Sequence, residues 1–348
     1  MSKVFPEHWN VFPFSEAVRD ATSEYSKLQR SDYLEQGRFP IVDQGRQHFG
    51  GYTNDESIIS DVNLPAIIFG DHTRIFKLID VPFCLGADGA KVLEPKKKLD
   101  KKFLFYYLSS LNIESAGYSR HFKFLKESVV PVPTLSEQKR IVTILDKAEA
   151  ITGKRQQAIR LADDLIRAVF LEMFGNLLTS SGYESSEKLM ISELVDYIDY
   201  RGKTPEKSDF GIPLITAKNV KYGYIDEEPR EFIPEENYDA WMTRGFPEKN
   251  DILFTTEAPL GNVALLGGYE KVAIGQRLIA LRSKGKVTHE YLLFLLLHPF
   301  VQDLIYARSS GSTVKGIRTK ELYDIELPVP DMQRQKEFSA IYWKSRSL

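Results

Sequence analysis

The chain has 348 residues, with 46 Lys or Arg and 48 Asp or Glu, so its formal net charge is −2. That balance excludes a globally basic nucleic-acid coat protein and a disordered polyelectrolyte, but it allows DNA binding through local patches. The single cysteine, Cys84, excludes a disulfide scaffold, and its apolar neighbours predict a buried, inert thiol. No segment is apolar and long enough for a signal peptide or a membrane span, so we expect a cytoplasmic protein that contacts no membrane.

Residues 1–133 are predicted to form a first module of mixed α/β structure. The short apolar run 64–70 (LPAIIFG) lies between turn residues, as is typical of a strand. The run 103–108 (FLFYYL) is predicted to be a core helix capped by Asp100. Polar loops lie before, between and after these elements, at 43–46, 70–74, 86–89 and 117–123, and all but 86–89 contain Arg, His or Lys.

Residues 134–175 predict one long helix. The sequence TLSE at 134–137 is a capping box, and Gly175 is a plausible end. About 40 residues of helix would be about 60 Å long. Apolar residues recur with heptad spacing, which favours a coiled-coil spacer over a helix packed only on its own domains. The main positions of this seam are Ile141, Ile144, Ala148, Ile151, Leu165 and Val169.

After a Ser/Thr-rich segment at 176–187, predicted to be a linker, residues 188–330 predict a second α/β module. Strands are expected at 252–256 (ILFTT) and 263–268 (VALLGG), and a core helix capped by Thr288 is expected over 291–297. Polar and cationic loops are at 201–205, 216–219, 275–277 and 309–318. A second helix is predicted to start at the N-cap Asp331 and to continue to residue 348.

The second module repeats the first. Residues 130–144 (VPVPTLSEQKRIVTI) and 327–341 (LPVPDMQRQKEFSAI) are identical at six of fifteen positions. Weaker matches, PIVDQG with PLITAK and FSEAVRD with ISELVDY, occur in the same order. The predicted fold class is therefore α+β or mixed α/β, with two tandem globular domains in a pseudo-two-fold repeat, joined by the long helix.

No familiar catalytic motif appears. The sequence contains no phosphate-binding loop, GxGxxG, HExxH or GxSxG motif and no cluster of potential metal ligands. With the duplication around a spacer, this favours a binding protein without a metal or cofactor of its own. Arg, Lys, Asn, Gln, Ser and Thr in the loops are the residue types that contact DNA phosphates and base edges. The alternatives are a coiled-coil scaffold that binds no DNA, and an enzyme with an unrecognised site.

The stretch 131–175 closely resembles the central helical region of specificity subunits of type I restriction–modification enzymes. Further stretches resemble the target recognition domains of these subunits: RGKTP with GIPLITAKNV, GSTVKGIRTKEL with LPVP, and FCLGADGAKVLEP. The resemblance implies a non-catalytic subunit whose two target recognition domains each read one half of a bipartite site in double-stranded DNA. Antiparallel paired helices would set the spacing and bind methyltransferase subunits, which carry S-adenosylmethionine, and an endonuclease/translocase subunit would join them.

Carried over loop by loop, the resemblance implies DNA contacts in both modules. In the first module the expected residues are Gln44, Arg46, His72, Arg74, Tyr118, Arg120 and His121. In the second module they are Arg201, Lys203, Thr204, Lys218, Asn219, Ser312, Thr313 and Lys315.

The second helical region departs from the family pattern. It spans about 18 residues from Asp331 to Leu348, or about 27 Å if helical, whereas in the family it runs as long as the first. We therefore expect a shortened chain in which part of the first helix has no intramolecular partner. The uncovered part of the seam is expected to bind a second copy of the chain, giving a homodimer, or a methyltransferase subunit.

Overall fold

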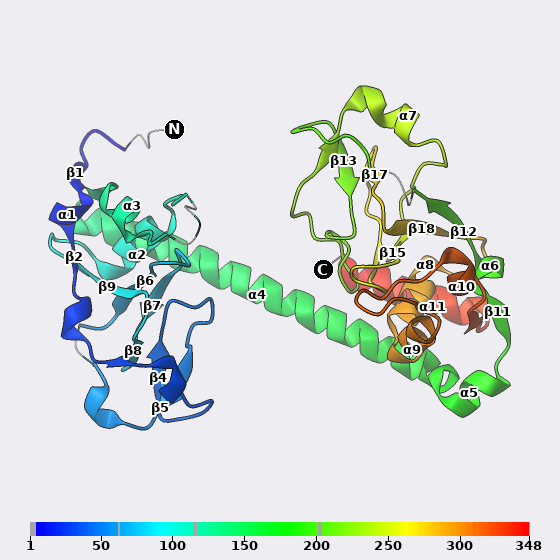
Figure 1. Cartoon of the computed structure of the whole chain (residues 1–348), viewed down its shortest axis with the longest axis horizontal. Helices are drawn as coiled ribbons and strands as arrows, with labels where there is room; N and C mark the ends of the chain where they lie inside the picture. Colours follow the sequence, from blue (N-terminus) through cyan, green and yellow to red (C-terminus); the bar gives the residue numbers. More distant parts are fainter. Residues whose placement is uncertain (1–4, 62, 115–116, 118, 201–203, 348) are drawn as a thin grey trace. The chain divides into compact units, whose positions relative to one another are not determined.

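The computed structural model describes residues 5–61, 63–114, 117, 119–200 and 204–347. The chain divides into two compact units, Met1–Arg155 (unit 1) and Gln156–Leu348 (unit 2). The boundary lies within one continuous helix, α4, which runs over Leu135–Phe174 as the sequence predicts (Figure 1).

Unit 1 is built from short strands and short helices. Strands β2-β9-β6-β7 form an antiparallel sheet, β3-β8-β4-β5 form a mixed sheet, and β1 pairs with β10. The strands are β1 Asn10–Pro13, β2 Val18–Asp20, β3 Lys27–Leu28, β4 Phe39–Val42, β5 Gly51–Thr53, β6 Ala66–Gly70, β7 Phe76–Ile79, β8 Cys84–Gly86, β9 Ala90–Pro95 and β10 Val129–Val132. The helices are α1 Phe14–Ala17, α2 Lys101–Ser109 and α3 Phe122–Lys126, with 3-10 turns at Thr22–Glu24, Arg30–Asp32 and Glu56–Ile58.

Unit 2 has three corresponding sheets, β12-β18-β15-β16, β14-β13-β17, and β11 paired with β19. The second has three strands where unit 1 has four, because no strand among the described residues of unit 2 takes the place of β3. The strands are β11 Lys188–Met190, β12 Val195–Asp199, β13 Ile212–Ile215, β14 Phe232–Ile233, β15 Ile252–Thr255, β16 Val263–Leu265, β17 Ala273–Ile274, β18 Leu278–Ser283 and β19 Glu326–Pro328. The helices are α5 Ser180–Ser185, α6 Ile191–Leu194, α7 Tyr238–Trp241, α8 His289–Leu297, α9 Pro299–Ala307, α10 Thr319–Tyr323 and α11 Met332–Arg346, with 3-10 turns at Gly175–Leu178 and Glu235–Asn237.

The topology confirms the predicted repeat. The parallel pair β4/β8 of unit 1 has its counterpart in β13/β17 of unit 2, and the antiparallel pairs β6/β9 and β15/β18 also correspond. The matched sequences PIVDQG and PLITAK lie on β4 and β13 with the loops that follow them. The mixed α/β fold with two similar domains and a long helix is therefore as the sequence predicts.

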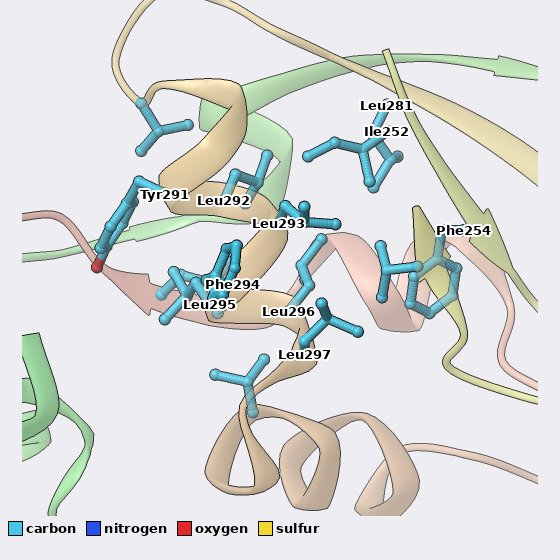
Figure 2. Close-up of a cluster of buried hydrophobic side chains, with 14 of the residues drawn as sticks. Ile252, Phe254, Leu281, Tyr291, Leu292, Leu293, Phe294, Leu295, Leu296 and Leu297 are labelled. Carbon is cyan, nitrogen blue, oxygen red and sulfur yellow. The ribbon is translucent and has the colours of Figure 1, made fainter. Parts of the chain in front are cut away.

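The core of unit 2 is built around α8. All residues from Tyr291 to Leu297 are buried, so this helix is apolar on every side, as a helix enclosed by other elements must be. Figure 2 shows their side chains close to Ile252, Phe254 and Leu281 from the neighbouring strands. The prediction that the two apolar runs are core helices is confirmed, including their caps Asp100 and Thr288.

The first turn of α4 has the predicted capping box. The Thr134 hydroxyl accepts from the Glu137 amide at 3.3 Å, and the Glu137 carboxylate accepts from the Thr134 amide at 3.1 Å. His8 also bonds this carboxylate, at 2.8 Å. Together these bonds, with that to His8 the strongest, lower the pKa of Glu137 to about 2. The cap therefore keeps its charge at neutral pH.

The two ends of α4 are buried in different cores. Ile141 and Val142 pack on the core of unit 1, whereas Ile166, Phe170 and Phe174 are buried in the core of unit 2. The second set is spaced by four residues, so it lies on a different stripe from the predicted seam.

Of the six seam residues, Ile141 and Val169 are half-buried, and Ala148 is exposed. Ile144, Ile151 and Leu165 are 56%, 53% and 58% exposed, respectively. The seam is thus not the buried face of α4 within the chain, because the aromatic residues on the neighbouring stripe fill the core of unit 2. Its role as a coiled-coil surface stays a prediction.

Helix α11 lies antiparallel to the last turns of α4. Arg334, near its start, donates to the Met173 carbonyl, and Arg346, near its end, forms a 2.7 Å ion pair with Asp163. Between them the Phe338 ring packs on Phe170, with ring centroids 5.4 Å apart. The antiparallel arrangement expected from the resemblance is therefore present over this short stretch.

The segment predicted to be a linker, 176–187, is folded. It forms the 3-10 turn after α4 and then α5, whose first turn is capped by the Thr179 hydroxyl at 3.1 Å from the Gly182 amide. The Tyr183 hydroxyl also donates to the Glu326 carbonyl at 2.9 Å. The prediction was wrong because Ser and Thr here cap a helix and do not mark a solvated coil.

Replacing the N-cap of α4, Thr134→Ala, should lower the free energy of unfolding of the chain by about 1 kcal/mol, because the Glu137 amide loses its acceptor. Urea unfolding followed by circular dichroism measures the change. Thr143→Ala is the matched control, because the Thr143 hydroxyl bonds only the Lys139 carbonyl within the same helix. Equal effects of the two substitutions would contradict a specific role of the cap.

Candidate nucleic-acid interface

Three loops of unit 1 meet at Gln44, which follows β4. Its side-chain oxygen accepts from the His72 amide at 3.2 Å, and its carbonyl accepts from the Thr73 hydroxyl at 2.6 Å. Gly89, in the turn between β8 and β9, has φ +67°, and a Cβ there would overlap the end of the Gln44 side chain, which would have to move. Arg277 holds the corresponding position of unit 2 with φ +71°.

These loops surround an open hollow of about 570 Å³. The hollow brings together three of the predicted contact residues, Gln44, Arg46 and His72. It is also lined by Arg30 and Tyr33, which the sequence analysis missed. They belong to the 3-10 turn before β4 and the residue after it, where no glycine-rich loop or repeat marks them in the sequence.

A buried lysine supports the floor of this hollow. The Lys77 ammonium donates to the Asp43 carbonyl at 2.8 Å and lies 3.6 Å from the Asp43 carboxylate. Burial lowers the pKa of Lys77, which the negative charge of Asp43 opposes. Burial, with Asp43, raises the pKa of Tyr33 to about 12, so its hydroxyl stays protonated at neutral pH and can donate a hydrogen bond.

Unit 2 has a hollow of about 510 Å³ beside the corresponding loops. Glu257 and Gln276 correspond to His72 and Asp88 of unit 1, but most of the other lining residues belong to the loop 310–318 and none to the loop after β13. The same two backbone hydrogen bonds hold its loops together: Asp71 N to Gly89 O and His121 N to Asp71 O in unit 1, and Thr256 N to Arg277 O and Ile317 N to Thr256 O in unit 2. Its lining includes an ion pair between Arg277 and Glu257 at 3.0 Å, together with Gln276, Ser310 and Arg318. The sequence identifies the loops that carry these residues, but not the residues themselves as DNA contacts.

Most of the predicted contact residues are accessible. Gln44 is half-buried, and the exposed residues are Arg46, His72, Arg74, Arg120, Thr204, Lys218, Ser312, Thr313 and Lys315. Ser312, Thr313 and Lys315 belong to the loop whose residues Gly311, Val314 and Gly316 line the hollow of unit 2. Arg74, Thr204 and Lys218 do not line either hollow, and the Arg74 guanidinium donates to the Ile113 carbonyl at 2.8 Å. Tyr118, Arg201 and Lys203 lie outside the described residues.

Two predicted contact residues are buried and serve the fold. His121 is 1% exposed, and its Nδ1 lies 2.9 Å from the Asp71 carbonyl. The Asn219 oxygen accepts from the Thr216 amide at 3.0 Å, and its nitrogen donates to the carbonyls of Asp226 and Pro229. We withdraw both from the proposed contact set, because their polar atoms are used inside their own units.

The described residues contain no group of three or more His, Cys, Asp or Glu side chains placed to bind a metal ion. Cys84 is buried, and burial raises the pKa of its thiol to about 11, so the thiolate that reacts is scarce at neutral pH. The side chains that line the two hollows can form hydrogen bonds and ion pairs.

A family model, the type I restriction modification DNA specificity domain, matches residues 6–161 and 184–341. The chain belongs to this family. The two matches correspond to the two copies of the repeat, each with the start of its following helix. Membership confirms the prediction of a type I specificity subunit, which is a non-catalytic component of these systems.

Curated relatives and a solved structure agree with the family. The chain is 23% identical over 342 residues to the type I restriction enzyme EcoR124I/EcoR124II specificity subunit of Escherichia coli, covering 92% of this chain and 82% of the relative. It is 22% identical to the MjaVIII specificity subunit of Methanocaldococcus jannaschii, covering 95% and 84%. The crystal structure of the type I S subunit from M. genitalium matches with a TM-score of 0.59 and 16% identity, covering 99% of this chain and 91% of that one, which supports the fold.

In the part of this specificity subunit that the structure describes, no helix has both the length and the apolar character needed to cross a membrane.

Replacing Asn219, Asn219→Ala, should destabilise unit 2 by about 2 kcal/mol, because the Thr216 amide and two carbonyls lose their partner in a buried site. The neighbouring exposed substitution Lys218→Ala should change stability by less than about 0.5 kcal/mol. Chemical unfolding of both variants measures the difference. A stable Asn219→Ala protein would return Asn219 to the set of DNA contacts.

Proposed function

We propose that each unit of this DNA specificity subunit reads one half of a bipartite site in double-stranded DNA, and that α4 sets the spacing between the halves. The observation that carries the proposal is that each unit has a polar hollow beside loops held together by corresponding backbone bonds. Each hollow is lined by arginine and glutamine side chains. Arginine bonds guanine O6 and N7, and glutamine bonds adenine N6 and N7.

The burial of α4 supports its role as a spacer. Its first turns are held in the core of unit 1 and its last turns in the core of unit 2, so the helix is anchored separately at each end. An α-helix adds 1.5 Å per residue, so the number of residues between the anchors sets a length.

The proposed partners follow from the family and from the uncovered part of α4. The relatives are specificity subunits of type I restriction enzymes. We infer that methyltransferase subunits carrying S-adenosylmethionine and an endonuclease/translocase subunit join this chain on DNA in the cytoplasm. The exposed apolar residues Ile144, Ile151 and Leu165 offer a surface for a methyltransferase subunit or for a second copy of the chain. This chain needs no cofactor of its own for that role.

The charge of the chain bears on its affinity. With a net charge of −2, the protein alone gains little from long-range attraction to DNA, so its cations near the hollows and the partner subunits must supply the phosphate contacts. A chain that acts only as a scaffold would have no DNA affinity to lose as salt rises.

Single substitutions at the two hollows should relax different halves of the target. Arg46→Ala, in unit 1, should lower discrimination at one half-site, and Lys315→Ala, in unit 2, should weaken recognition of the other. A lost base contact costs about 1–3 kcal/mol. The measurement is co-expression with a methyltransferase subunit of a type I system that forms a complex with this chain, followed by sequencing of the methylated sites.

Arg38→Ala is the matched control, because Arg38 is an exposed cation of unit 1 that pairs with Glu56 and does not line the hollow. Its methylated sites should equal those of the native chain. If Arg46→Ala and Lys315→Ala altered the same half-site, the assignment of one half to each unit would be wrong.

Lengthening α4 should change the spacing without changing the half-sites. Four residues inserted after Gly153, where an added Cβ would meet no atom within 4 Å outside the adjacent helix backbone, would add about 6 Å of helix. That length is close to two base pairs, so the methylated sites should have a spacer longer by about that amount. Sequencing of the methylated sites again provides the test, and altered half-sites would contradict the modular reading.

A further inference from the structure

The helix that follows each β-rich part starts with the same buried side chain. Gln138 of α4 and Gln335 of α11 are both fully buried. The Gln138 oxygen accepts from the amide of the cap Asp100 at 2.7 Å, and its nitrogen donates to the carbonyls of Lys98 and Pro133. In unit 2 the equivalent partners of Gln335 are Thr288, Lys286 and Pro330, at 2.9, 3.5 and 2.9 Å.

These bonds fix each helix on its unit in the same way, because one amide joins the start of the helix, the preceding strand end and the cap of the core helix. Because the two sets of glutamine hydrogen bonds are alike, they do not discriminate between α4 and α11. If nothing else differed, either helix could dock on either unit, and two copies of the chain could exchange helices.

The junctions differ two turns further along. In unit 1 the Lys102 ammonium of α2 pairs with the Asp146 carboxylate of α4 at 2.9 Å, and the Tyr106 hydroxyl donates to the same carboxylate at 2.7 Å. The charge on the core helix is positive, and its partner on the connecting helix is negative.

In unit 2 the charge on the core helix is reversed. Glu290 takes the place of Lys102, two residues after the cap, and Trp343 takes the place of Asp146, eight residues after the glutamine. The Glu290 carboxylate is 5% exposed and accepts from the Ser339 hydroxyl at 2.7 Å and the Trp343 indole N–H at 2.6 Å. Both donors come from α11.

An exchanged helix would meet the wrong chemistry. Docking α4 on unit 2 would place Asp146 against the buried Glu290, which combines like-charge repulsion with the loss of two hydrogen-bond donors. Docking α11 on unit 1 would leave Lys102 facing an indole without its carboxylate partner. The first mismatch is the costlier one, because Lys102 and Asp146 are 41% and 38% exposed and solvent weakens their interaction.

We propose that the chain encodes which helix docks on which unit: the buried glutamines form a shared lock, and the pairs Lys102–Asp146 and Glu290–Trp343 form two different keys. The key of unit 2 carries most of the discrimination. Its partner is the chain's own α11, and the helix that it rejects is α4 of a second copy, because the α4 of the same chain follows directly on β10 of unit 1.

The test uses one substitution in two backgrounds of the full chain. Glu290→Lys in the native chain should lower the thermal midpoint of unit 2 by about 5 °C, because Ser339 and Trp343 lose their acceptor. In the background Ser339→Val with Trp343→Asp, which copies the α4 residues, the same Glu290→Lys should raise the midpoint by a similar amount. A sign reversal is the result expected of a key.

Glu337→Lys is the matched control for the change in charge, because Glu337 is exposed on α11 and bonds only Gln333 in the described structure. It should shift the midpoint equally, and slightly, in both backgrounds. If Glu290→Lys lowers the midpoint in both, Glu290 is an ordinary buried group and the proposal is overturned.

A second pair keeps the test decisive if the variants of unit 2 fail to fold. Lys102→Glu should lower the midpoint of unit 1 in the native chain by about 2 °C and raise it in the background Val142→Ser with Asp146→Trp. This site is half-exposed, so the variants tolerate the changes. The same sign in both backgrounds would overturn the proposal.

Discussion

The rest of the molecule depends on how a single helix is held at its start, and the buried amide of Gln138 holds it. Its three hydrogen bonds reach the preceding strand end, the loop before α2 and the cap of α2. Together they fix both the rotation of α4 about its axis and its position along it. The regular geometry of the helix carries that rotation along its length. The position of Gln138 therefore determines which residues in the middle of α4 face solvent. An apolar residue could not do this, because the amides and carbonyls around it would be left without partners.

Helix α4 shows how packing on globular cores and a heptad pattern compete. A helix buried against a domain uses a stripe with a period of 3.6, whereas a coiled-coil seam uses 3.5. In α4 the two patterns run on neighbouring stripes, and the core of unit 2 buries the stripe of Ile166, Phe170 and Phe174. The heptad residues Ile144, Ile151 and Leu165 are left exposed. An apolar stripe of this kind on a helix is consistent with the assembly surface that we propose for α4.

Much of this architecture could be predicted because its signals are local. The caps Thr134, Asp100 and Thr288 act within one turn of helix. The repeat is recognised from sequence identity between residues 130–144 and 327–341. The candidate site is harder to predict from the sequence, because contacts between distant segments decide which residues line a hollow. Asn219 is of a residue type that contacts DNA, but its side-chain amide bonds the backbone of its own turn. His121 is buried against Asp71. Tyr33 gave no signal at all, since only the fold brings it beside residues 44–46.

The two units also show what a duplicated chain keeps and what it changes. The glutamine lock and the backbone bonds between loops are the same in both, and they serve folding. The linings of the hollows are different: unit 1 has a buried lysine beneath Asp43, with Arg46 and His72 at the rim, whereas unit 2 has the pair Glu257–Arg277. Different donors and acceptors select different base edges. On the proposed function, therefore, the two halves of the target differ in sequence, and the site has no two-fold symmetry even though the protein that reads it is a repeat.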